Sequence, residues 1–185
     1  MTETVIKKPV RVFFSLWPQH EERAALAAWQ GPLQQLCGGR VTPVDNLHNT
    51  LVFIGEVEFE RLDALQLAAQ EVSGAGFQLV FDVARYWGHN HIVYAAPELV
   101  PVHLRQLVAA LEQSLHHHHF KFDQSSYKPH VTLLRHAHWT DSPLPAMPPV
   151  QWKMRDFALV QSVSERQGAR YEVLYRIPFT AGADK

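Results

Sequence analysis

Apolar residues recur along the chain with two different spacings, which predict an alternation of strands and helices. β-Branched or alternating apolar runs bounded by turn formers indicate strands, and apolar residues three or four positions apart indicate amphipathic helices. Strands are predicted at residues 10–16, 47–54, 77–83, 91–95, 130–135, 152–160 and 171–179. Helices are predicted around residues 26–36, 59–72 and 104–115. Three helices and seven strands predict the α+β class, and their repeated order predicts two related lobes.

Residues that break regular structure add detail to this outline. The Gly31-Pro32 pair is expected to split the first helix, because proline removes a helical hydrogen bond. Gly55 is expected to end the second strand. The strand at 77–83 is expected to form a hairpin with the strand at 91–95.

Length and composition favour one compact protein. The chain has 185 residues, of which 46% are hydrophobic, and this predicts a single bilobal domain over residues 1–185. It contains no run of about 18 apolar residues, and its N-terminal stretch lacks the apolar core of a signal peptide. We therefore expect a cytoplasmic protein without a membrane segment.

Charge and cysteine content exclude several classes of protein. The formal net charge is −1 and the pI is about 6.9, so bulk electrostatics does not favour coating a nucleic acid. A protein of this charge that acts on RNA is expected to bind one end of it locally. Cys37 is the single cysteine, which excludes an internal disulfide and a cysteine-rich zinc site.

The most informative pattern is a repeated His-x-Thr-Leu. His48-Asn49-Thr50-Leu51 returns as His130-Val131-Thr132-Leu133, and each copy lies in a predicted strand. Side chains alternate between the two faces of a strand, so His and Thr of each copy point the same way. Two such pairs facing one another would surround a small anion with two imidazoles and two hydroxyl donors. This arrangement predicts a phosphate site with a general acid and a general base.

These paired motifs resemble those of the two-histidine (2H) phosphoesterase superfamily. The flanking segments DNLHNTLVFIGEV and YKPHVTLLR resemble its LigT-like branch, the RNA 2',3'-cyclic phosphodiesterases, and the likeness covers nearly the whole chain. The resemblance implies a bilobal α+β fold, in which two pseudo-symmetric antiparallel sheets carry helices outside and enclose a central cleft. It also implies hydrolysis of an RNA 2',3'-cyclic phosphate end to a 2'-phosphate.

In that reaction two histidines would divide the proton transfers. One neutral imidazole removes a proton from the attacking water, and one imidazolium protonates the leaving ribose oxygen. The resemblance implies His48 as the acid and His130 as the base, although the sequence alone does not distinguish them. Thr50 and Thr132 are expected to donate hydrogen bonds to phosphate oxygens. No metal or other cofactor is required, and a monomer is expected.

Arg135 follows the second motif, and the resemblance implies a phosphate clamp at this position. A guanidinium suits that role by its charge and its bidentate geometry. Arg135 is five residues from His130, however, so a regular strand would turn it to the opposite face. A strand end or a bulge at Leu134 is needed to bring it into the site.

Asn49 departs from the family pattern, which has an apolar residue between His and Thr. A buried amide there requires hydrogen-bond partners or costs about 1–3 kcal/mol.

Other candidate residues have structural explanations. His116 to His119 could bind a metal, but consecutive side chains point in different directions around a helix, so a solvated helix end is favoured. His136 and His138 are expected in an exposed loop. Four aromatic residues could stack on a nucleobase, although core packing is favoured for each. They are Phe14, Trp17, Tyr127 and Trp152.

Two alternatives to a hydrolase stay open. The same acid and base could catalyse the reverse reaction, joining tRNA halves through a 2'-5' linkage. The protein could also be a nucleotide-binding or RNA-end-binding module without turnover, although a pure binder does not need two proton-transfer groups.

Overall fold

The computed structural model describes residues 7–166 and 168–180, so part of the N-terminal stretch discussed above lies outside the described residues. Within these ranges the chain forms four α-helices, two 3-10 helices and ten strands. The α-helices are α1 (His20–Ala27), α2 (Gln30–Cys37), α3 (Leu62–Gln70) and α4 (Val102–His117). The 3-10 helices are η1 (Val44–Asn46) and η2 (Phe59–Arg61). The strands are β1 (Val10–Leu16), β2 (Arg40–Val41), β3 (Asn49–Val57), β4 (Phe77–Phe81), β5 (Val83–Trp87), β6 (Ile92–Ala96), β7 (Val131–Arg135), β8 (Val150–Met154), β9 (Asp156–Glu165) and β10 (Gly168–Pro178).

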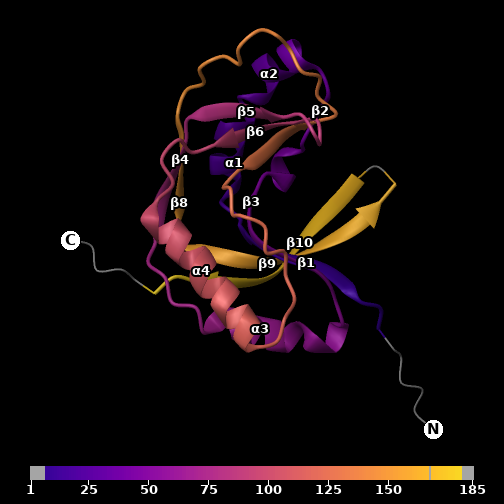
Figure 1. Cartoon of the computed structure of the whole chain (residues 1–185), viewed down its shortest axis with the longest axis vertical. Coiled ribbons are helices and arrows are strands. Elements are labelled where there is room, and N and C mark those ends of the chain that lie inside the picture. The colour runs from indigo at the N-terminus through magenta and orange to yellow at the C-terminus, as the bar shows by residue number, and fades with distance from the viewer. Residues whose placement is uncertain (1–6, 167, 181–185) are drawn as a thin grey trace.

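The strands form two four-stranded antiparallel sheets and one two-stranded ribbon, which confirms the α+β class (Figure 1). The first sheet has the order β10-β9-β1-β3, and the second has the order β2-β7-β6-β5. Each sheet therefore takes strands from both halves of the chain. The C-terminal β9 and β10 complete the first sheet, and the short N-terminal β2 forms an edge of the second. The two lobes are interlocked because neither half of the chain builds a lobe alone.

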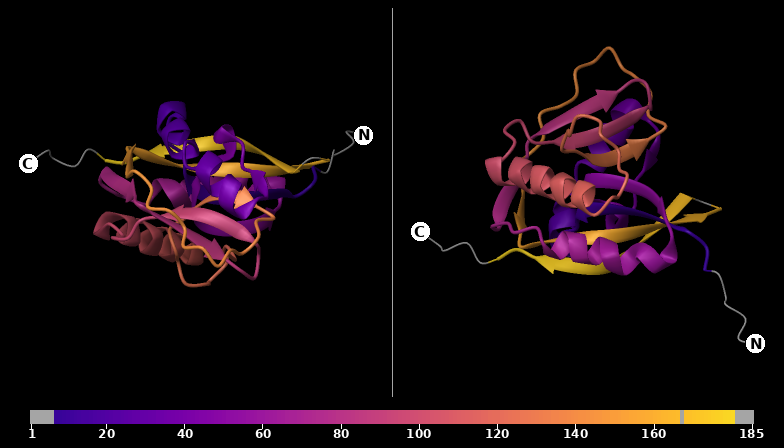
Figure 2. Two further views of the ribbon diagram at one scale, coloured as in Figure 1. Left: turned by 90° about the horizontal axis from the view of Figure 1, so that it is seen from above. Right: turned by 60° about the horizontal axis from the view of Figure 1, so that its bottom comes forward.

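The helices bury the apolar stripes that the sequence pattern predicts. Helices α3 and α4 pack against each other, with α4 also contacting β3 and α3 contacting β10 of the first sheet (Figures 1 and 2). Helix α2 contacts β2 and β7 of the second sheet. Four leucines of α4 are buried, as expected from their spacing: Leu104, Leu107, Leu111 and Leu115.

The N-terminal helix is split as predicted, but the break lies earlier than expected. Helix α1 ends at Ala27 and α2 begins at Gln30, so Gly31 and Pro32 lie in the first turn of α2. Proline is tolerated there because the first amide groups of a helix have no intrahelical partner. The apolar residues at helical spacing in the predicted helix 26–36 include Leu36, which would lie on its buried stripe, but Leu36 is 36% exposed and this prediction is wrong.

Two predicted strands are each divided in two. The predicted strand 77–83 breaks at Asp82, whose carboxylate accepts a hydrogen bond from the Glu98 amide. Its first part, β4, pairs with β8, and only β5 forms the predicted hairpin with β6. The predicted strand 152–160 likewise breaks at Arg155, which separates β8 from β9. Apolar residues continue to alternate across Asp82, at Phe81 and Val83, so the sequence pattern does not reveal that break.

Gly55 does not end its strand, because β3 continues to Val57. Gly55 has φ of +89°, a conformation that favours glycine, and it follows a shift in the register between β1 and β3. It therefore belongs to a β-bulge instead of a strand end. The last strand, predicted from residue 171, begins earlier, because Gly168 is the first residue of β10.

Candidate active site

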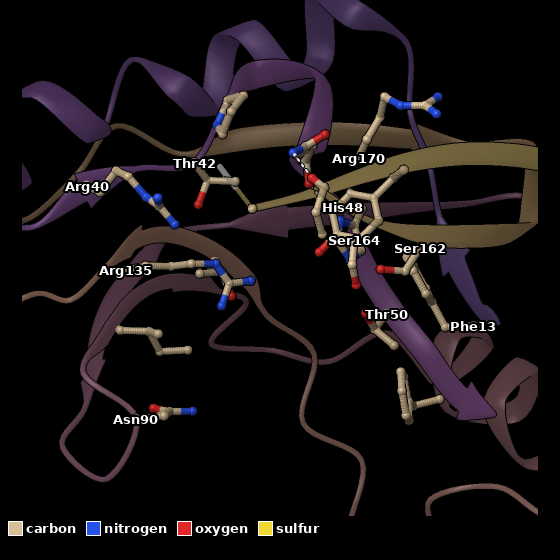
Figure 3. Close-up of a pocket in the computed structure, with 18 of the residues that line it drawn as sticks. Phe13, Arg40, Thr42, His48, Thr50, Asn90, Arg135, Ser162, Ser164 and Arg170 are labelled. Atoms are coloured by element: carbon tan, nitrogen blue, oxygen red, sulfur yellow. Dashed lines mark hydrogen bonds between the residues drawn. The ribbon is translucent and has the colours of Figure 1, made fainter. Parts of the chain in front are cut away.

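The five residues predicted for the site line one cleft of about 910 Å³ between the two sheets (Figure 3). They are His48, Thr50, His130, Thr132 and Arg135. Each histidine directly precedes its strand, β3 or β7, and each threonine is the second residue of that strand. The antiparallel sheets thus bring together two motifs that are far apart in the sequence.

Both imidazoles are fixed by the same local hydrogen bond. Nδ1 of His48 lies 2.6 Å from the carbonyl oxygen of Asn46, and Nδ1 of His130 lies 2.7 Å from that of Lys128. A carbonyl oxygen can only accept, so each Nδ1 carries the proton and donates it. In the neutral ring, Nε2 then carries the lone pair, which is the form that a general base needs.

His48 is surrounded by aromatic rings. Trp17 stacks on it with ring centroids 5.1 Å apart and an interplanar angle of 19°, and Phe13 and Tyr171 each lie 5.1 Å away. Burial among these rings lowers the pKa of His48 to about 4, and the positive charges of His130, Arg135 and Arg23 add to this shift. The hydrogen bond to the Asn46 carbonyl opposes it in part. His48 is therefore neutral at pH 7 before an anion binds.

His130 has a similar but less enclosed environment. The edge of its ring contacts Trp87, with centroids 4.7 Å apart at 71°, and Tyr94 lies 5.7 Å away. Burial lowers the pKa of His130 and the charge of Arg135 lowers it further, while the bond to Lys128 opposes both. A bound phosphate anion would raise the pKa of both histidines by favouring their charged forms.

A bulge in each motif strand shapes the site. On β7, Thr132 pairs with Tyr94 and Leu134 pairs with Val93, which leaves Leu133 as the extra residue. This bulge changes the alternation of side chains, so Arg135 shares the cleft with Thr132. The predicted bulge therefore exists, one residue before Leu134.

The first motif has its bulge at the equivalent residue. Thr50 pairs with Ser15 and Val52 with Phe14, so Leu51 is the extra residue of β3. The repeat in the sequence is thus also a repeat of a local backbone irregularity.

Asn49 is fully buried, and its side chain is only partly satisfied. Its Oδ1 accepts a hydrogen bond of 3.0 Å from the Tyr127 hydroxyl, whereas Nδ2 has no hydrogen-bond partner among the described residues. Burial also raises the pKa of Tyr127, so this hydroxyl stays protonated and can donate. The departure from the family pattern is accommodated by a tyrosine from the loop before β7.

None of the four aromatic residues considered as stacking candidates lines the cleft. Phe14 and Trp152 are completely buried and Trp17 is 6% exposed, which confirms core packing as the better explanation for them. Tyr127 bonds to Asn49 instead of lining the cleft. The aromatic residues that do line it are Phe13, Phe53, Trp87 and Tyr171. Their position depends on strand register and bulges, so no local signal distinguishes them from core residues.

The remaining histidines lie away from the cleft. His118 Nε2 is 2.9 Å from a carboxylate oxygen of Glu71, and this contact connects the ends of α3 and α4. His136 and His138 are exposed, as expected. In the described part of the chain, no group of three or more His, Cys, Asp or Glu side chains is placed to hold a metal ion. No helix there is long and apolar enough to cross a membrane.

Comparison with known proteins agrees with this geometry. The family model of the LigT-like phosphoesterases matches residues 16–94. The RNA 2',3'-cyclic phosphodiesterase of Escherichia coli (strain K12) is 31% identical over 179 residues, which cover 95% of this chain and 99% of that protein. The enzyme of the same name from Thermus thermophilus is 29% identical over 182 residues, covering 89% of this chain and 88% of that protein.

The fold also agrees with that of a solved structure. The crystal structure of E. coli LigT in complex with 3'-AMP superimposes with a TM-score of 0.83 at 30% identity. The match covers 94% of this chain and 99% of the LigT chain. The chain therefore belongs to the LigT-like phosphoesterases.

Proposed function

We propose that this protein is an RNA 2',3'-cyclic phosphodiesterase, a hydrolase that opens a terminal cyclic phosphate to a 2'-phosphate. The observation that carries this proposal is the pair of His-Thr units facing one cleft, each with the imidazole Nδ1 bound to a backbone carbonyl. The relatives that match nearly the whole chain carry the same activity in their names.

The proposed reaction uses the two histidines in turn. Neutral His130 accepts a proton at Nε2 from a water molecule as its oxygen attacks phosphorus. The bond from phosphorus to the ribose 3' oxygen breaks, and protonated His48 gives its proton to that oxygen. The products are a 2'-phosphate and a 3'-hydroxyl, and the two imidazoles have exchanged their protonation states. The assignment of acid and base follows the family resemblance.

His48 must carry a proton for this step, although its pKa is about 4 without ligand. The negative charge of the cyclic phosphate raises this pKa when the substrate binds. An imidazolium held among aromatic rings is also a stronger acid than one in water, which favours transfer of the proton to the leaving oxygen. Burial of the acid therefore supports its proposed role.

The other cleft residues would stabilise the charge on phosphorus. Thr50 and Thr132 donate hydrogen bonds to the non-bridging oxygens, and Arg135 supplies a positive charge with bidentate geometry. No step of this proposal requires a metal ion.

The decisive test is incubation with an RNA ending in a 2',3'-cyclic phosphate, in the presence of EDTA. Wild-type protein should convert it to a 2'-phosphate, and both His48→Ala and His130→Ala should lose this conversion. His103→Ala is the matched control, because His103 is an exposed histidine of α4 away from the cleft. Folded wild-type protein that binds the RNA without converting it would instead indicate a binding module. Turnover that EDTA abolishes would contradict the metal-free mechanism.

The same proposal treats residues 1–185 as one bilobal domain that works as a monomer in the cytoplasm. The five proposed site residues line one cleft within a single chain, which supports the expectation of a monomer. Sedimentation equilibrium at micromolar concentration should then give a mass near the 21.1 kDa of one chain.

A further inference from the structure

Four side chains form a row across the second sheet, along one wall of the cleft. In the strand register Arg40 of β2 lies opposite Arg135 of β7, Arg135 lies opposite Ile92 of β6, and Ile92 lies opposite Trp87 of β5. Residues directly opposite in neighbouring strands project from the same face of a sheet. All four residues line the cleft. The row therefore presents two cations at one end and apolar surface at the other.

The two arginines form a like-charge pair. The register places two positive charges side by side at the end of the row that lies at the edge of the sheet. Both side chains are exposed, so packing of the core does not require them. Figure 3 shows both guanidinium groups extending into the same space beside the cleft. A guanidinium is well suited to bind a phosphate in bidentate fashion, so the pair can hold two anionic groups.

The two arginines differ in their distance from the reacting centre. The charge of Arg135 lowers the pKa of both His48 and His130, whereas that of Arg40 is not among the causes of either shift. Arg40 lies on the edge strand β2, one strand farther from the motif histidines. A phosphate between the histidines can therefore contact Arg135, while Arg40 faces the position of a second anion.

The other two residues of the row indicate on which side of Arg135 a second anion would bind. On the other side of Arg135 the row continues with Ile92 and Trp87, which offer no charge to a phosphate. Among the residues of this sheet that line the cleft, a ribonucleotide chain with its terminal phosphate at Arg135 thus finds its next cation at Arg40.

We propose that Arg40 binds the phosphodiester that precedes the terminal cyclic phosphate, so that the protein prefers the end of an RNA chain to a cyclic mononucleotide. This inference rests on the proposed function and assigns the residue that distinguishes an RNA end from a cyclic mononucleotide. Arg40 would be a specificity residue that never contacts the reacting phosphorus.

The test compares two substrates, a nucleoside 2',3'-cyclic phosphate and a trinucleotide that ends in the same group. For Arg40→Gln, the ratio of kcat/KM for the trinucleotide to kcat/KM for the mononucleotide should fall about tenfold, the effect of losing one charge-assisted hydrogen bond. Arg135→Gln should slow both substrates by similar factors. The matched control is Arg105→Gln, which removes an exposed arginine of α4 outside the cleft and should leave the ratio unchanged.

Salt dependence gives an independent measurement. For the trinucleotide, the slope of log kcat/KM against log salt should become shallower by about 0.7 in Arg40→Gln, because one phosphate contact is lost. Arg40→Lys retains the charge and should keep most of the slope.

Three other results would contradict the role of Arg40 or the proposed function. Equal losses on both substrates would overturn the inference and place Arg40 at the reacting phosphate. A ratio that changes in Arg11→Gln but not in Arg40→Gln would also overturn it and direct the RNA to the first sheet, since Arg11 of β1 lines that side of the cleft. Wild-type protein that converts neither substrate would refute the proposed function itself, a result distinct from either of these.

Discussion

The two His-x-Thr-Leu motifs have the same local structure in different surroundings. In both, the histidine Nδ1 donates to the carbonyl two residues earlier, that of Asn46 or Lys128. In both, the leucine is the extra residue of a β-bulge, at Leu51 or Leu133. The two motifs are thus equivalent in local structure, and whatever distinguishes the two histidines must come from residues far away in the chain.

The surroundings do distinguish them. His48 contacts three aromatic rings from β1, the residue after β1, and β10, whereas His130 contacts two rings from β5 and β6. Arg135 follows the second motif at the third position after Thr132. The equivalent position after the first motif holds Phe53, which carries no charge. The repeated motif therefore supplies the proposed reacting groups, while the neighbouring strands decide how each one titrates.

The largest expected effect tests whether both units are needed. His48→Ala and His130→Ala should each lower kcat by about 10²–10⁴, because each removes one partner of a paired acid and base. Groups that act together are not additive, so the double variant should lose little more than either single one. Single-turnover rates on a cyclic-phosphate RNA measure this. A multiplicative loss in the double variant would show that the two histidines act independently.

Substitution of Arg135 tests the difference that only the second motif is followed by an arginine. Arg135→Gln should lower kcat/KM about tenfold to a hundredfold, the range expected for losing hydrogen bonds to a charged group. Its charge lowers the pKa of both histidines, so its removal should move the acidic limb of the pH–rate profile to higher pH.

Arg135→Lys is the matched variant. It retains the charge without the planar fork, so it should keep the pH profile but recover only part of kcat/KM. A pH profile that does not move in Arg135→Gln would contradict the electrostatic role.

The difference in burial predicts a difference in stability at low pH. The pKa values of His48 and His130 both lie below the value of about 6.5 that a histidine has in an unfolded chain. Between about pH 6.5 and pH 4 the unfolded state therefore binds more protons than the folded state. The free energy of unfolding should therefore fall as the pH falls through this range. For His48, with a pKa of about 4, the contribution is at most about 3 kcal/mol.

Urea unfolding at pH 7 and pH 4 measures this contribution. His48→Gln should remove more of the pH-dependent loss than His130→Gln, because His48 has more aromatic and cationic neighbours. Equal effects of the two substitutions would show that the aromatic surroundings do not control the titration of His48.

The smallest expected effect concerns the residue between His and Thr, which is Asn49 in the first motif and Val131 in the second. Tyr127→Phe should cost about 1–3 kcal/mol, because the buried Asn49 side chain then loses the hydroxyl that donates a hydrogen bond to its Oδ1. Adding Asn49→Val should restore most of this loss, since replacing both partners by apolar groups can be nearly neutral. Chemical denaturation of wild-type protein, the two single variants and the double variant measures the four stabilities of this double-mutant cycle. A double variant as unstable as the sum of the singles would refute the pairing.

The sequence by itself identified the proposed reacting groups and much of the outline of the fold. The repeat of His48 and Thr50 at His130 and Thr132 predicted two strands with polar pairs on one face, because strand alternation is a local rule. The spacing of the leucines in α4 likewise predicted its buried face.

Only the tertiary structure decided which distant segments meet at the site. The breaks at Asp82 and Arg155, the edge strand β2 and the bulge at Leu133 all depend on pairing with distant strands, and local propensity does not encode such pairing. The aromatic rings around His48 and the position of Arg40 opposite Arg135 follow from that pairing. A pKa depends on every charge and apolar group within a few ångströms, so the tertiary structure decides how the two histidines titrate even though the sequence identifies them.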